Sequence, residues 1–495
     1  MCLSLFVSCA PKQPVKAELD LSEYAQSQTQ KGNLEVKKSQ DLVQDRVGMD
    51  AKNWPGFSEK SFKAYVLEAM RITRTPGVVL AVVKNGELVL SRAYGHEDIE
   101  KTRVLDLESD LRFSLEGMSE ALAGYVISAL VQARLLSWEM AVSEVVPGFK
   151  YGDVTLGHVL TGTSGLSGSG VAKFFDVSAG NIMKQAARLE RMHAPGTVYA
   201  PNDLLLSAVM YGIAYKVMGG DLGNVEQVDW QSNYDRLMAK YGPLKLDQTV
   251  GAVSEKAVMG HDVDFEFRLK PLKARRGVSG TLSEVTAWVR AELLSSSKGN
   301  FELRNLGYQQ KPVMSGVNLY RAGGVRNGIS SAVGIIPELN FGYVVLANAR
   351  GGDRVDLLIE RQILDIELNQ HASEVMLGEV KEVLEQMRAS RQRFFSQVEM
   401  RPEESWLDLI LGDYRHAWLG EIRLVVRDGV GILQTQHWES RVGRISYPNG
   451  DTGIVLLDPP LSAMVLHPWM DGGEVRGVTM SDVGMDYRFE RVLLP

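Results

Sequence analysis

The sequence of 495 residues predicts a mixed α/β domain followed by a smaller all-β, barrel-like domain. Three observations favour this fold class. An Asn-Gly turn joins two strand-like runs between residues 78 and 90, which is the signal of a β-hairpin. Residues 117–136 are apolar nearly all round, as in a buried helix. After Trp406 the chain consists of short strands separated by turn residues, which indicates a small barrel or sandwich.

The first 55 residues are predicted to lie outside the folded domains. Residues 1–9 form a short apolar run that ends at Cys9 and resembles the tail of a bacterial lipoprotein signal, although a basic start is missing. Residues 10–55 are polar and charged and are interpreted as a tether. We therefore expect a lipid anchor on Cys9 and a periplasmic or outer-membrane-associated location in a bacterium. The alternative is an ordinary apolar start.

The remaining elements follow from hydrophobic periodicity. The first domain is expected over residues 56–370, a helical connector over 371–400 and the β domain over 401–495. Within the first domain, apolar residues at helical spacing or in β-branched runs predict several further elements. They are helices at Ser61–Met70, 203–218 and 283–294, and strands at 78–83, 329–336 and 342–347.

Composition excludes several classes of function. The net charge of −7 gives no general attraction to nucleic acid or anionic lipid. The two cysteines both lie in the first nine residues, so we expect no disulfide framework. None of the eight histidines pairs with another at metal-ligand spacing, so no metal and no cofactor are expected. No segment is apolar for long enough to predict a transmembrane helix.

Four stretches stand in an order typical of one enzyme family. Thr75–Gly86 is similar to that family's opening hairpin, and Thr155–Leu166 to its RHLLTHTSGL stretch, with Gly162 where a histidine is usual. Pro195–Thr197 resembles the approach to the second catalytic motif, and Gly334–Asn348 the strands after the third. Over about residues 57–368, the chain thus resembles the class C β-lactamase and penicillin-binding-protein family of serine hydrolases. The resemblance implies an antiparallel sheet flanked by helices, with a helical insert.

The family's catalytic motifs are degenerate at the matching positions. Its enzymes use a serine at a helix start and a lysine three residues later, which accepts the serine proton. Here the two positions fall on Gly117 and Glu120. The second motif falls near Tyr199 and Asn202 with the wrong spacing. The third falls on Ala322, Gly323 and Gly324, where a lysine or histidine should come first. The resemblance therefore implies a fold without its acyl-transfer residues.

Other serines are weaker candidates for a nucleophile. The only other Ser-x-x-Lys pattern is Ser295–Lys298, in a polar stretch far from the buried helix, and we interpret it as a coincidence. Ser119 would point away from the face shared by Gly117 and Glu120, and Ser114 precedes the helix.

The sequence allows two interpretations of Glu120. It is either a carboxylate favoured by the helix N-terminus or a charge-swapped residue of the former site. In the second case, we expect it to pair with Arg321 or Arg326, which flank the third motif. Tyr199 is expected to be packed, and Asn202 to cap the following helix.

Three functions stay open on the sequence. The first is a non-catalytic envelope protein that binds a peptide, a peptidoglycan-like fragment or a protein partner in the former active-site groove. The second is a divergent hydrolase of ester, amide or β-lactam substrates, in which Glu120 activates water. In the third, the first domain is a scaffold and the β domain binds a ligand, which would be favoured by exposed tryptophans on one face. The tryptophans concerned are Trp406, Trp418, Trp438 and Trp469.

Overall fold

A computed structural model of the protein describes residues 54–99, 103–107, 110–168, 170–175, 178–219, 228–243, 258, 261–264, 269–271, 278–296, 307–326, 328–349, 355–482 and 485–492. The predicted lipid-anchor position, Cys9, and residues 10–53 of the predicted tether lie outside these ranges. Among the helices in the described ranges, none is long and apolar enough to cross a membrane.

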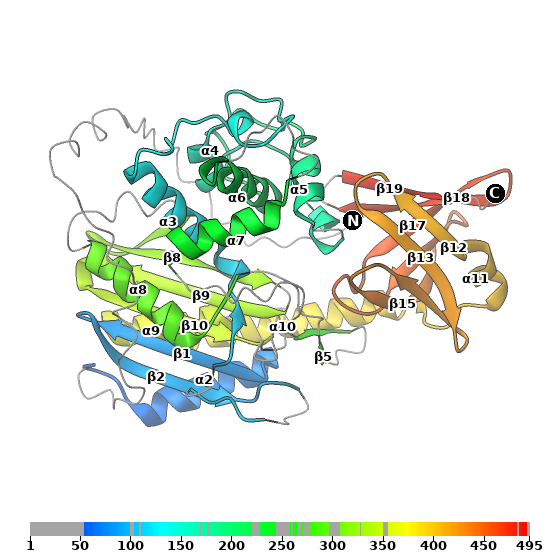
Figure 1. The fold of residues 1–495 in the computed structure, drawn as a ribbon. Coiled ribbons are helices and arrows are strands. Elements are labelled where there is room, and N and C mark those ends of the chain that lie inside the picture. Colours follow the sequence, from blue (N-terminus) through cyan, green and yellow to red (C-terminus); the bar gives the residue numbers. More distant parts are fainter. Residues whose placement is uncertain are drawn as a thin grey trace. The chain divides into compact units, whose positions relative to one another are not determined.

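The first domain is built on a six-stranded antiparallel sheet, as the family resemblance implies (Figure 1). Its strand order is β2-β1-β10-β9-β8-β7. The hairpin between β1 and β2 turns at Asn85 and Gly86, which both have positive φ, so the Asn-Gly prediction is confirmed. The strands are β1 (Gly77–Lys84), β2 (Glu87–Gly95), β7 (Gln309–Met314), β8 (Val317–Arg326), β9 (Ile329–Ile336) and β10 (Phe341–Ala347).

Helices cover both faces of this sheet, so its central strands are buried on both sides and are mostly apolar. One face packs against α2 (Glu59–Thr73) and α9 (Val355–Leu368). The other packs against α3 (Ser119–Gln132) and α8 (Leu282–Ser296) (Figure 1). Alternate residues of each strand therefore enter different cores.

A helical insert follows α3 in the chain. Within the insert, Asn202 caps helix α6 (Asp203–Val217). The Asn202 side chain accepts a hydrogen bond from the backbone N–H of Leu205 at 3.0 Å. The predicted cap is thereby confirmed. The insert contains α4 (Leu156–Leu160), η5 (Gly170–Phe174), α5 (Ala179–Ala186), α6 (Asp203–Val217) and α7 (Trp230–Tyr241). Short strands accompany it: β3 (Phe113–Ser114) with β6 (Ser279–Gly280), and β4 (His261–Val263) with β5 (Leu269–Pro271).

The long helix α10 (Ser373–Phe395) precedes the C-terminal domain, which is a closed eight-stranded β-barrel. Neighbouring strands pair in the order β15-β14-β13-β12-β19-β18-β17-β16, and β15 pairs with β16 to close the ring. The short β11 (Val398–Glu399) adds to β15, and α11 (Glu404–Ile410) lies between them in the chain. The barrel strands are β12 (Gly412–His416), β13 (Gly420–Arg427), β14 (Val430–Gln434), β15 (Glu439–Ser446), β16 (Thr452–Leu456), β17 (Val465–Asp471), β18 (Glu474–Asp482) and β19 (Met485–Arg491).

Candidate functional site

The first and third degenerate motifs meet where the start of α3 touches β8. The 3-10 turn η3 (Glu116–Met118) brings Gly117 against Gly324. A Cβ atom at Gly117 would lie 2.5 Å from the Gly324 carbonyl oxygen, closer than real Cβ contacts allow. The two backbones are therefore in direct contact. No serine side chain fits at the nucleophile position unless this contact opens.

A buried hydroxyl completes this contact. Ser331, on the neighbouring strand β9, is fully buried, and its Oγ would lie 2.8 Å from a Cβ at Gly117. This Oγ has no hydrogen-bond partner among the described residues. The position of the family nucleophile is thus filled by a carbonyl group and a hydroxyl group that belong to the sheet itself.

Glu120 lies one helical turn beyond Gly117 and is half-buried. Burial raises the pKa of its carboxyl group, and the negative charge of Asp203 raises it further. The positive charge of Arg326 acts in the opposite direction, but Arg326 forms its ion pair with Asp203. Glu120 is therefore a weaker acid than usual, and it forms a cluster of three ionisable side chains with Asp203 and Arg326.

The second motif is split by the start of α6. Asn202 is buried and holds the insert together, since its Nδ2 donates to the Ser167 carbonyl at 2.6 Å. Tyr199 is 60% exposed, so the expectation that it is packed is wrong. Its ring lies over Gly162, where a side chain would collide with it, and its hydroxyl accepts a bond from Gln309 at 3.3 Å. The tyrosine therefore faces solvent at the rim of the site.

Residues 62–221 match the family model for β-lactamase. This part of the chain is therefore similar to the β-lactamase family. It is 23% identical over 350 residues to protein flp of Staphylococcus aureus (strain COL), which covers 62% of this chain and 66% of that protein. It is 26% identical over 234 residues to esterase EstB of Burkholderia gladioli, which covers 44% of this chain and 57% of that protein. The matched parts thus span less than two thirds of each relative.

Comparison with solved structures gives the same fold. The octameric penicillin-binding protein homologue from Pyrococcus abyssi superposes with a TM-score of 0.52 at 16% sequence identity, covering 88% of this chain and 100% of that chain. At this identity the likeness concerns the fold alone.

The expectation that Arg321 lies at the groove of the first domain is wrong. Because side chains alternate along a strand, Arg321 points to the opposite face of the sheet from Ala322 and Gly324. It donates to Asp356 at 2.7 Å and to Glu360 at 2.6 Å, both on α9. It therefore does not pair with Glu120.

The other candidate residues do not assemble a second catalytic site in the described part of the chain. Ser114 lies in β3 and pairs with Ser279. The Ser295–Lys298 pattern runs beyond the described residues after 296. No group of three or more histidine, cysteine, aspartate or glutamate side chains in the described ranges could hold a metal ion. The tryptophans of the barrel do not share an exposed face: Trp406 and Trp438 are buried, Trp418 is half-buried and Trp469 is exposed.

Two residues of the site were not anticipated. Asp203 follows the predicted cap Asn202 and pairs with Arg326, so it is a charged neighbour of Glu120. Its place at a helix N-terminus is a weak signal in the sequence. Ser331 could have been placed from the alternation of β9, which puts it on the same face as Val333.

Proposed function

We propose that this chain is a non-catalytic β-lactamase-related protein that binds a peptide, a peptidoglycan-like fragment or a protein partner at the rim of the former active site. One observation carries the proposal: the backbone of Gly117 lies against that of Gly324, so the nucleophile position has neither a nucleophile nor room for one.

The chemical argument has two parts. Acyl transfer in this family needs a hydroxyl group and a nearby base, and here the base position carries the carboxyl group of Glu120. Removal of a serine nucleophile alone lowers the rate by about six powers of ten in a well-studied serine protease. Loss of both groups, with the space closed, argues against an acyl-enzyme.

The exposed rim supports binding. Residues 191–199 run along the surface and end at Tyr199, which is bonded to Gln309 of β7. Three large apolar side chains project from this loop: Met192 is 63% exposed, Val198 38% and Tyr199 60%. The loop is fixed, because the backbone N–H groups of Met192 and His193 both donate to Gly165. Preordered apolar and aromatic side chains are typical of binding surfaces. The proposed location at the cell envelope, with a lipid on Cys9, rests on the N-terminal sequence pattern.

A second candidate function is hydrolysis without a covalent intermediate. The raised pKa of Glu120 favours it, because a carboxyl group titrating closer to neutrality is a better general base. Because the chain is similar to a protein named as an esterase, esters are the substrates to test first.

The test is a labelling and turnover assay on the full chain. A fluorescent penicillin and a fluorophosphonate probe report any reactive serine, and chromogenic esters report turnover. We expect neither labelling nor turnover. Labelling of a serine would overturn the proposal, whereas turnover that disappears in Glu120→Gln would establish the second candidate.

Binding is measured separately by co-sedimentation with purified peptidoglycan sacculi and by crosslinking to envelope extracts. Tyr199→Ala should weaken capture by about tenfold, as expected for an exposed aromatic anchor. Val375→Ala is the control, since Val375 is 63% exposed on α10. Equal capture by both variants would remove the rim as the binding surface.

A further inference from the structure

The core of the C-terminal barrel contains two large side chains that the barrel does not supply. Val171 and Phe175 belong to the helical insert, yet both are 1% exposed and pack among the barrel residues. They come from η5 and the residue that follows it, more than two hundred residues before the barrel begins.

Phe175 makes aromatic contacts inside the barrel. Its ring centroid lies 5.7 Å from that of Trp438, at an interplanar angle of 70°, and 5.6 Å from that of Phe489. Both geometries fall within the range in which aromatic rings attract each other. The backbone of the segment is held as well, because Trp438 Nε1 donates to the Phe174 carbonyl at 2.7 Å. At its start, Gly170 comes so close to the Tyr487 hydroxyl that a Cβ there would lie 2.8 Å away.

An eight-stranded barrel is wide enough either to be filled by its own side chains or to hold one small ligand. In this barrel, the side chain of Phe175, which comes from the helical insert, fills part of the interior. We propose that the barrel is a receptor for a benzyl-sized aromatic group, and that residues 170–175 occupy it as an intramolecular ligand.

The same segment connects the barrel to the rim of the former active site. Ser167, three residues before Gly170, accepts a bond at its carbonyl from Asn202 and one at its hydroxyl from the Glu190 N–H at 3.1 Å. The exposed loop that carries Tyr199 follows Glu190. In this proposal, occupancy of the barrel by Phe175 supports the rim because Ser167, close before the segment, is bonded to Asn202 and Glu190. An aromatic ligand that displaces Phe175 would loosen the rim.

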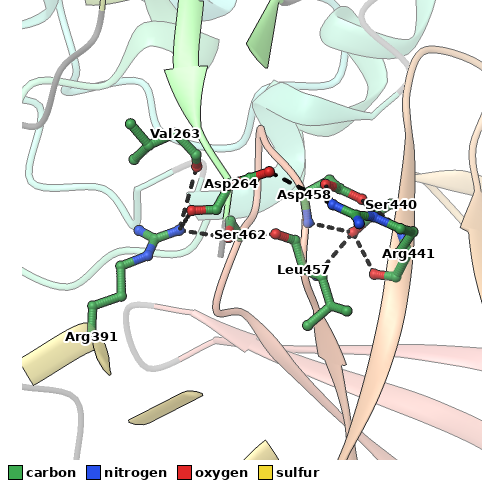
Figure 2. A network of polar contacts seen from close by, with 8 residues as sticks. All are labelled: Val263, Asp264, Arg391, Ser440, Arg441, Leu457, Asp458 and Ser462. Carbon is green, nitrogen blue, oxygen red and sulfur yellow. Dashed lines mark hydrogen bonds and ion pairs between the residues drawn. The ribbon is translucent and has the colours of Figure 1, made fainter. Parts of the chain in front are cut away.

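A separate polar network holds the barrel to the first domain (Figure 2). Arg391 of α10 donates to Ser462 at 2.6 Å, and Arg441 of β15 lies 3.7 Å from the buried Asp264 and 2.6 Å from Asp458. None of these residues belongs to the segment 170–175. The barrel should consequently stay attached when that segment is altered, so the proposal can be tested on the full chain.

The experiment compares Phe175→Ala with Phe149→Ala by hydrogen exchange and mass spectrometry, with and without toluene. Phe149 is a matched control, because it is a buried phenylalanine of the same insert that contacts Tyr151 and not the barrel. In Phe175→Ala we expect exchange to rise by about tenfold or more in β14, β15, β19 and residues 162–168 and 190–199. Toluene, which replaces the lost side chain, should restore protection.

The control should leave exchange in the barrel unchanged, with or without toluene. Unchanged exchange in the barrel of Phe175→Ala, or no effect of toluene, would overturn the receptor proposal. Changes confined to the barrel would overturn its coupling to the rim. If Phe175→Ala does not fold, Phe175→Leu gives the same comparison with a smaller cavity. No readout here depends on hydrolysis or on the rim ligand, so the result stands apart from the proposed function.

Discussion

The two faces of strand β8 differ in the side chains that they carry: one holds a buried, ion-paired arginine, and the other holds small residues at the third motif. On the face toward α9, Arg321 is 2% exposed and its charge is matched by two carboxylates. On the face toward α3, the third-motif positions Ala322 and Gly324 carry no polar side chain, and the backbone of Gly117 packs directly on Gly324. The charges on the first face are paired within the fold, whereas the second face has no hydroxyl group at Gly117 and no cation at Ala322.

The framework of this fold is stabilised on one face of β8, and the catalytic motif positions lie on the other. The buried cluster ties β8 and β9 to α9, because Ser330 of β9 also donates to Asp356 at 2.7 Å. Burial alone would lower the pKa of Arg321, but Glu360 and Asp356 outweigh it and raise that pKa. Sheet and helix are therefore held together by ion pairs and hydrogen bonds on the face that points away from Gly117.

The largest effect on stability is expected when the positive charge of Arg321 is removed. Arg321→Met leaves two buried carboxylates without a cation, which should lower the free energy of unfolding by about 3–5 kcal/mol. Urea unfolding of the variant and of the natural chain measures this loss. The triple variant with Asp356→Asn and Glu360→Gln should regain most of the loss. No regain would mean that the arginine acts by packing alone.

On the opposite face, Gly117→Ser should cost about 1–3 kcal/mol, because the new side chain collides with the Gly324 carbonyl. Adding Glu120→Lys should restore the motif in sequence but not penicillin labelling. Gly378→Ala is the control, since Gly378 lies in α10 with open space around it and should gain up to about 1 kcal/mol. Penicillin labelling of the double variant would show that the contact opens readily.

The sequence predicted the fold of the first domain well, because its strongest signals are local. The Asn85-Gly86 turn fixes one hairpin, and the predicted strand 329–336 has the same bounds as β9. Gly117 and Glu120 could be placed by register alone. The contact between Gly117 and Gly324 could not, since it joins backbones two hundred residues apart and leaves no mark on composition or periodicity.

The prediction for Arg321 is wrong for a simple physical reason. Arg321 stands next to the third motif in the sequence, but the period of two along a strand puts immediate neighbours on opposite faces. Arg326 is an even number of residues from Gly324 and lies on the site face, beside Asp203. The burial of Phe175 in the barrel could not be predicted either, because the local sequence does not indicate which of two domains buries a phenylalanine.

A smaller effect concerns the junction of barrel and insert, and depends on pH. The Nδ1 atom of His416 accepts bonds from the N–H groups of Trp418 and Leu419, and Asn181 binds the Trp418 carbonyl at 2.6 Å. Burial lowers the pKa of His416. Its stabilising contribution is therefore complete above the ordinary histidine pKa of about 6.5 and is lost as the pH falls through the lower folded-state value.

We expect a loss on the order of 1 kcal/mol between pH 7.5 and pH 5 from this group. The measurement is the difference in unfolding free energy between the natural chain and His416→Asn, whose amide oxygen keeps the acceptor without titrating. This subtraction is needed because burial also lowers the pKa of His158 and His261. Identical pH profiles for the two proteins would exclude His416 as the titrating group.

The smallest effect on stability is expected at the ion pair beside the former site. The side chains of Arg326 and Asp203 are 22% and 40% exposed, so Arg326→Gln should cost less than about 1 kcal/mol. Its effect on Glu120 should be clearer, because the positive charge that opposes the raised pKa disappears while Asp203 stays. Carbon-detected NMR of the Glu120 carboxyl group should show its midpoint moving to higher pH, whereas Asp203→Asn should move it to lower pH. Opposite shifts in these two variants would establish that the charges around Glu120 act on it directly, and a Glu120 that does not respond to either would have to lie outside the cluster.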